Sequence, residues 1–142
     1  MVLVAYYSRK GHVKKIAESY AGKNGYELYE IKDTVNRDGL FGFMRAGRQA
    51  MKKIATPIEP VAADLASYEK VVVCGPVWAG TFACPIRTFL QDYGSSINAV
   101  EYILVSGGKE GAYQGLFAEM DGICGKKHLR GQSLSQRQSL TE

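Results

Sequence analysis

The sequence contains few of the residues from which metal sites and disulfide frameworks are built. Only three cysteines and two histidines occur among its 142 residues. Cys74, Cys84 and Cys124 are an odd number and form no C-x-x-C pair, which argues against a disulfide framework or a thiolate metal site. His12 and His128 are too few and too far apart to bind a metal without several carboxylates. We therefore predict no metal and three buried thiols, with a redox-active Cys84 as the alternative.

Long hydrophobic runs are also absent. The longest apolar run, around Val71 to Cys74, is far shorter than the roughly 20 residues that a membrane-spanning helix requires. The N-terminus lacks the apolar segment of a signal peptide. The sequence therefore predicts a cytoplasmic protein without a membrane span. Its 142 residues and 46% hydrophobic content are typical of one domain, which we expect to extend over residues 1–142.

No block of the chain concentrates charge of one sign. The 18 Lys and Arg residues exceed the 14 Asp and Glu residues, which gives a formal net charge of +4. The basic residues are scattered among acidic ones, and the sequence has no zinc-finger spacing, no RNP-type aromatic strand and no internal repeat. These absences argue against a nucleic acid partner.

The sequence does contain a regular alternation of strand and helix patterns. Continuous apolar runs predict buried strands, and apolar residues at helical spacing predict amphipathic helices between them. Gly22 and Gly25 are the expected stop signals of the first helix. The predicted strands cover residues 2–7, 26–31, 70–77, 100–106 and 129–134, and the predicted helices begin near residue 12, cover 40–54, and centre on 86–93 and 116–123. Such alternation predicts a doubly wound, three-layer α/β sandwich with a parallel sheet.

Ligands of doubly wound sheets bind beyond the carboxyl ends of the strands, where the order of connection reverses. Three loops of unusual composition follow predicted strands: SRKGHV at 8–13, GPVWAGTFACP at 75–85 and SGGKEGAY at 106–113. The predicted topology and the unusual residues therefore indicate the same edge of the sheet as the binding site.

The first loop has the composition of a phosphate site. The following helix offers backbone N–H groups and a partial positive charge, Gly11 permits close approach, and Ser8 and Lys10 add a hydroxyl donor and a positive charge. A glycine turn with a serine cap is the alternative interpretation. Neither G-x-G-x-x-G nor G-x-x-x-x-G-K-[ST] is present, so dinucleotide and Walker-type nucleotide binding lack their motifs.

The second and third loops have the composition of a pocket for a planar ring. The second carries Trp78, the only tryptophan of the chain, in a loop too small to have a core of its own, so its ring is expected to face a ligand. Gly80 and Thr81 can bring backbone and hydroxyl donors to the same ligand. In the third loop Tyr113 is either a second aromatic wall or a residue that packs on the sheet.

These three loops carry a family resemblance. YYSRKGHVKKIA, GPVWAGTFACPIRTFL and SGGKEGAY resemble the flavodoxin family, in particular its small members with a P-x-W-x-G-T second loop, over nearly the whole chain. The resemblance implies strand order 2-1-3-4-5 and non-covalently bound FMN, with the phosphate on the first loop and the ring between the second and third. The cofactor-binding residues that we expect are Ser8, Arg9, Lys10, Gly11, His12, Val13, Pro76, Val77, Trp78, Ala79, Gly80, Thr81, Ser106, Gly107, Gly108 and Tyr113.

The chain departs from the pattern of this family in three respects. Lys10 and Val13 occupy positions where the first loop of the family commonly has threonine, so two hydroxyl donors are missing. The chain is basic, whereas well-known flavodoxins are strongly acidic, which favours a different, acidic partner. After the last predicted strand, SQRQSLTE is too short for the final helix of the family, and an uncovered sheet face would favour a homo-oligomer.

The segment 40–54 permits two interpretations. Phe43, Met44, Gly47, Met51 and Ile54 share one side, and basic residues share the other. We expect a helix that covers the sheet and exposes its basic face to solvent. A membrane-surface helix, apolar on one side and basic on the other, is the alternative.

The leading hypothesis is an electron-transfer protein in which FMN carries the chemistry. It requires no catalytic acid, base or nucleophile, and its partner is a redox protein or a small-molecule electron donor or acceptor. An NAD(P)H- or quinone-linked flavin oxidoreductase uses the same architecture and stays open. A binding or regulatory module that has lost FMN is a third possibility. A response-regulator receiver domain is excluded, because Gly75 and Pro76 stand where its phospho-accepting aspartate would be.

Overall fold

A parallel sheet forms the centre of the molecule. The computed structural model describes residues 1–136. Five parallel strands lie in the order β2-β1-β3-β5-β6, and the short β4 pairs with the end of β3 in antiparallel fashion. The predicted order 2-1-3-4-5 is confirmed, since the fourth and fifth predicted strands are β5 and β6. The strands are β1 (Val2–Tyr6), β2 (Glu27–Glu30), β3 (Lys70–Trp78), β4 (Thr81–Phe82), β5 (Val100–Ser106) and β6 (Gly131–Ser135).

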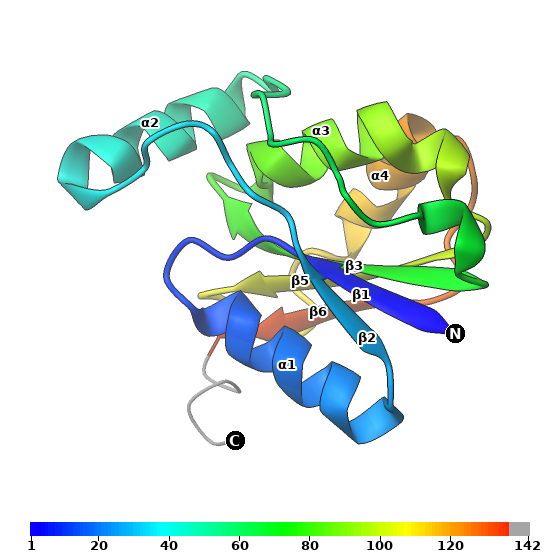
Figure 1. The fold of residues 1–142 in the computed structure, drawn as a ribbon. Coiled ribbons are helices and arrows are strands. Elements are labelled where there is room, and N and C mark those ends of the chain that lie inside the picture. Colours follow the sequence, from blue (N-terminus) through cyan, green and yellow to red (C-terminus); the bar gives the residue numbers. More distant parts are fainter. Residues whose placement is uncertain (137–142) are drawn as a thin grey trace.

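Helices cover both faces of this sheet (Figure 1). α1 lies on one face, and α3 and α4 lie on the other. α2 is on the same side as α3 and extends past the sheet at the upper left of the view. The helices are α1 (His12–Asn24), α2 (Gly39–Met51), α3 (Cys84–Tyr93) and α4 (Phe117–Cys124), with 3₁₀ turns η1 (Leu65–Ser67), η2 (Gly94–Ser96) and η3 (Gln114–Leu116). The doubly wound, three-layer prediction is confirmed.

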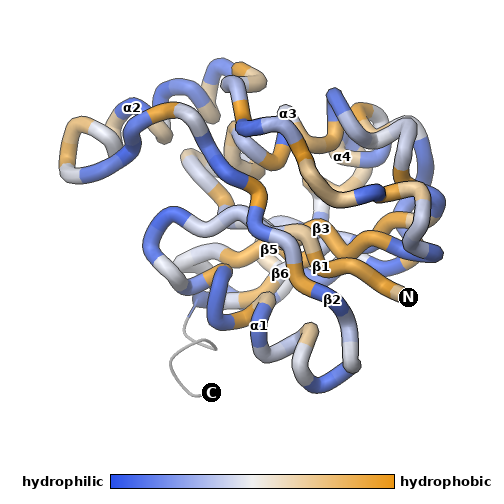
Figure 2. Tube along the Cα trace, viewed as in Figure 1, coloured by the Kyte–Doolittle hydropathy of each residue, from blue (hydrophilic) through white to orange (hydrophobic). Residues whose placement is uncertain are grey.

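The strands separate two hydrophobic cores. Val4 of β1 packs with Ile16 of α1 in one core, whereas Leu3 of β1 packs with Phe89 of α3 in the other. This division follows from the period of two along a strand, which sends successive side chains to opposite faces. Figure 2 shows the resulting pattern, in which the central strands are the most hydrophobic part of the chain. A strand with two buried faces is mostly apolar, and this is why the apolar runs identified the central strands.

The ends of two predicted features differ from expectation. α1 continues through Gly22 to Asn24 and ends before Gly25, so only the second of the two predicted stop signals ends it. The expectation that no final helix follows the last strand concerns residues 137–142, which lie outside the described residues. None of the helices in the described part of the chain is long and apolar enough to cross a bilayer.

The predicted inner face of α2 is wrong. Phe43, Met44, Met51 and Ile54 are exposed, and the buried residues are the small ones, Gly42, Ala46 and Ala50. Gly42 lies so close to the preceding loop that a Cβ there would be 2.0 Å from the carbonyl carbon of Arg37. Small residues let the helix approach its neighbours closely, and the large apolar residues consequently point outward.

Candidate functional site

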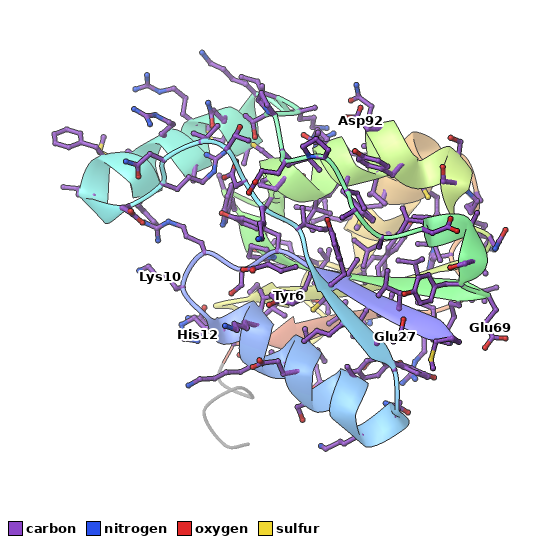
Figure 3. All side chains as sticks on the ribbon, in the orientation of Figure 1. Tyr6, Lys10, His12, Glu27, Glu69 and Asp92 are labelled. Carbon is purple, nitrogen blue, oxygen red and sulfur yellow. The ribbon has the colours of Figure 1, made fainter. Side chains whose placement is uncertain are left out.

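The turn between β1 and α1 forms the first wall of the site. Gly11 precedes α1 with a left-handed backbone (φ 98°), and its N–H donates to Ser8 Oγ over 2.9 Å. α1 has no side-chain cap and no acidic residue in its first turn. Lys10 and His12 lie here, at the opposite end of the molecule from Glu69 (Figure 3). This helix terminus therefore has the electrostatic character that favours an anion.

Arg9 connects this turn to α2. Its Nε donates to the carbonyl oxygen of Arg37 over 3.0 Å, and its Nη2 donates to that of Gly39 over 3.2 Å. Its guanidinium carbon also lies 5.5 Å from the ring centroid of Phe43, and Lys10 Nζ lies 5.9 Å from the same ring. Two cations thus face one aromatic ring of α2, which fixes the distance between the first loop and this helix.

The second loop is a hairpin that orients Trp78. β3 and β4 pair Trp78 with Thr81 and Val77 with Phe82, and the two residues between them, Ala79 and Gly80, have left-handed backbones (φ 49° and 84°). Two successive left-handed residues are typical of a type I′ turn. Thr81 Oγ1 is buried and has no hydrogen-bond partner among the described residues. A buried side-chain oxygen without a hydrogen-bond partner is unusual in a folded protein.

These loops enclose a cavity of about 460 Å³ at the carboxyl ends of the strands. Its volume is in the range of small-molecule sites. It brings together the first, second and third predicted loops, as well as one side of α2. The lining residues are Ser8, Arg9, Lys10, His12, Val13, Phe43, Ala46, Gly47, Pro76, Val77, Trp78, Ala79, Val105, Ser106, Gly107 and Gln136.

Five of the predicted site residues do not line this cavity. Gly11 is in the turn between β1 and α1, and Gly80 and Thr81 complete the hairpin beside Trp78. Gly108 donates its N–H to Ser106 Oγ over 3.2 Å, and Tyr113 donates its N–H to Ser133 Oγ over 3.1 Å. Gly108 and Tyr113 therefore support the third loop from outside the cavity.

Five lining residues of the cavity were not predicted from the sequence. Phe43, Ala46 and Gly47 come from α2, and Val105 and Gln136 come from the end of β5 and the residue after β6. Val105 and Gln136 belong to strand ends that the topology already directs to this edge, so their position in the predicted strands could have identified them. No signal in the sequence orients α2 toward the cavity.

A buried arginine lies behind Trp78. The guanidinium carbon of Arg37 is 4.8 Å from the ring centroid of Trp78, and the ring of Tyr7 meets the same indole edge-on at 5.6 Å. Tyr7 OH lies 3.5 Å from Asp33 Oδ2. Burial, followed by the charge of Asp33, raises the pKa of Tyr7, so its hydroxyl stays protonated as a donor.

Three side chains satisfy the hydrogen-bonding groups of this arginine. Nε is paired with Asp33, Nη1 donates to Gln49 Oε1 over 2.8 Å, and Nη2 donates to Thr56 Oγ1 over 3.0 Å. Arg37 is only 4% exposed, and a buried charge is tolerated only when it is paired and hydrogen-bonded. The network joins the second loop to α2 through Gln49, so Trp78 and the α2 wall are held by one group.

Comparison with known proteins identifies the family. The family model described as Flavodoxin matches residues 1–115. The chain belongs to the flavodoxin family. No curated protein matches this flavodoxin-family sequence.

Solved structures share the fold of this flavodoxin-family chain. A flavoprotein from Lactobacillus acidophilus NCFM, crystallised in complex with FMN, is 23% identical, with a TM-score of 0.75 over 99% of this chain and 95% of the other. A protein from Bacteroides eggerthii is 18% identical, with a TM-score of 0.81 over 99% and 93%. The NAD(P)H:quinone oxidoreductase from Methanothermobacter marburgensis is 12% identical, with a TM-score of 0.52 over 99% and 90%. Identities this low carry information on the fold alone.

The cysteines of this flavodoxin-family chain are buried and unpaired, as predicted. Burial raises the pKa of Cys84, although the charges of Arg37 and Arg87 oppose this effect. Because the thiolate is the reactive form, a raised pKa argues against the alternative of a redox-active Cys84. Within residues 1–136, no three His, Cys, Asp or Glu side chains lie together in a way that could hold a metal ion.

Proposed function

We propose that this flavodoxin-family chain binds FMN non-covalently in the cavity and functions as an electron-transfer protein. The observation that carries the proposal is the union of the three predicted loops around one cavity, with a basic helix N-terminus and the only tryptophan both on its lining. Bound FMN would supply the redox chemistry, and the protein would supply its position and electrostatic surroundings.

The residues at the first loop fit the phosphate end of FMN. Val13 is buried and offers no side-chain donor in place of the threonine of the family, so backbone N–H groups of the turn and of α1 are the proposed ligands. Arg9 and Lys10 line the same end and add positive charge against a phosphate that carries close to two negative charges. Ser8 Oγ accepts the N–H of Gly11, which leaves its proton available to an oxyanion.

The second and third loops fit the ring end. Pro76, Val77, Trp78 and Ala79 form one wall, and Ser106 and Gly107 form the other. Thr81 does not line the cavity and is proposed to support the hairpin that carries Trp78. Gly80, Gly108 and Tyr113 are proposed to support these walls. A redox protein or a small-molecule donor or acceptor is the proposed partner, and the cytoplasmic location stays a prediction.

An absorption spectrum of the purified protein tests this function. After FMN is added and the excess removed, we expect flavin absorption bands at about 370 nm and about 450 nm. We also expect the fluorescence of Trp78 to be quenched. Gly11→Ala should weaken FMN binding by about tenfold, since a left-handed backbone costs a non-glycine residue roughly 1–2 kcal/mol. Gly22→Ala, a helical position with open space around it, is the matched control and should bind FMN as the parent does.

Other results would replace the proposal. A protein that takes up no FMN would indicate a binding module without the cofactor, the alternative that the missing threonines favour. Bleaching of the bound flavin by NAD(P)H alone would indicate an oxidoreductase. Unchanged tryptophan emission in a protein that visibly binds FMN would remove Trp78 from the ring site.

A further inference from the structure

The outer side of α2 exposes large apolar residues. Leu40, Phe41, Met44 and Met51 are 71%, 81%, 53% and 71% exposed. They belong to the helix that extends past the sheet in Figure 1, so no other described element covers them. Clusters of exposed apolar side chains are unusual on a monomer and mark surfaces that contact something else.

Basic residues surround these apolar side chains. Arg48 and Lys52 are exposed and border the same part of the helix surface. Arg45 is also exposed, whereas Lys53 is paired with Glu119 over 3.3 Å. The chain has no acidic residue between Asp38 and Glu59. An apolar centre with a charged rim is the usual anatomy of a protein interface, in which methionine, aromatic residues and arginine are enriched. The sign of this rim calls for an acidic counterpart.

The same side of α2 is continuous with the candidate cofactor cavity. Gly47 lines that cavity and also a shallow, open hollow on the surface of the helix, which Met44, Arg48, Met51 and Lys52 border. A partner whose side chain enters this hollow would lie directly beside the cavity. The opposite side of α2 is held by Gln49, which accepts a hydrogen bond from Arg37.

We propose that the outer surface of α2, formed by Leu40, Phe41, Met44, Arg48, Met51 and Lys52 and named the α2 face, docks an acidic redox protein. This inference rests on the proposed electron-transfer function and specifies its partner. If a second copy of the chain docked through the same surface, the basic residues of the two copies would face and repel each other. An anionic lipid surface would complement the basic residues, but it has no projecting side chain that could enter the hollow.

Binding of two small haem proteins of opposite charge tests the α2 face. The probes are acidic cytochrome b5 and basic cytochrome c, and affinity is measured by isothermal titration calorimetry on the full chain, with and without FMN. We expect cytochrome b5 to bind in both forms, with an affinity that falls as salt is added, and cytochrome c to bind at least about tenfold more weakly.

Two double variants separate the two contributions of the α2 face. Arg48→Glu with Lys52→Glu reverses the rim, and Phe41→Ser with Met44→Ser removes the apolar centre; each should weaken cytochrome b5 binding about tenfold or more. Lys127→Glu with Arg130→Glu makes the same charge change in exposed residues just before β6, at the other end of the strands, and should leave the affinity within about twofold.

Each outcome is decisive. Equal binding by all variants, or no salt-dependent binding of cytochrome b5, would overturn the proposal. Sedimentation with phosphatidylglycerol vesicles that requires the same residues, without cytochrome b5 binding, would replace the partner by a membrane surface, and self-association abolished by Phe41→Ser would replace it by a second copy. FMN spectra of every variant show whether the cofactor still binds, and docking is also measured on the protein without FMN. Loss of docking can therefore be distinguished from failure of the proposed function.

Discussion

Arg37 shows how one buried charge can organise a binding wall. Its guanidinium lies against Trp78, pairs with Asp33 and donates to Gln49 of α2 and to Thr56. An arginine four residues from an aspartate in a polar stretch is normally read as exposed. The sequence therefore offered no reason to expect that this side chain would be buried behind the predicted ring site. Its role depends on contacts between segments far apart in the chain, which residue patterns do not encode.

Replacement of Arg37 tests this arrangement. Arg37→Met should lower the free energy of unfolding by about 3–5 kcal/mol, because it leaves the buried carboxylate of Asp33 without its charge partner. The double variant Asp33→Asn with Arg37→Met should recover part of this loss. Urea denaturation followed by Trp78 fluorescence measures both. An unchanged midpoint in Arg37→Met would show that the network does not hold the site together.

At the scale of elements, the strands that are buried on both faces of the sheet could be predicted from the sequence. β1 and β5 are buried along their whole length and β3 is buried from Val71 to Gly75. The apolar runs of these strands predicted their positions and those of the loops after them. α2 was placed correctly along the chain but assigned the wrong face. Two stripes of helical period coexist in it, one of large apolar residues and one of small residues. Periodicity cannot decide between them, because the choice depends on how closely the neighbouring backbone approaches.

Gly42 allows this choice of face to be tested. A Cβ at this position would lie 2.0 Å from the Arg37 backbone, so Gly42→Ala should displace α2 and lower the free energy of unfolding by about 1–3 kcal/mol. Gly47→Ala is the matched control in the same helix, where nothing lies within 4 Å of the added carbon; it should be neutral or stabilising by up to about 1 kcal/mol. Thermal denaturation compares them. Equal stability of the two variants would mean that α2 does not pack through its small residues.

At the scale of the whole molecule, the double core makes the fold sensitive to alkaline pH. Cys74 is completely buried between the layers, and burial raises its pKa from 9.0 to about 12. Burial also raises the pKa of Tyr102. Above pH 9 the unfolded chain releases the thiol proton of Cys74 while the folded chain keeps it. This contribution to stability is therefore complete below pH 9 and is lost as pH rises toward 12.

Denaturation at two pH values measures this effect. We expect the free energy of unfolding to fall between pH 7 and pH 10, with a loss of about 1 kcal/mol from Cys74 alone. Cys74→Ala should be less stable at both pH values because it leaves a cavity, but its decrease between them should be smaller by that amount. An identical decrease in parent and variant would exclude Cys74 as the source.

The edge of the sheet at β2 has a consequence for how the protein behaves at high concentration. An outermost strand presents unpaired backbone groups that can recruit the same strand of another molecule. β2 is only four residues long and begins and ends with glutamates, Glu27 and Glu30, the first of which is labelled in Figure 3. If two β2 strands of different molecules paired, their glutamate carboxylates would lie close together and repel each other. The short length and the two carboxylates of this edge therefore disfavour fibril-like growth through β2.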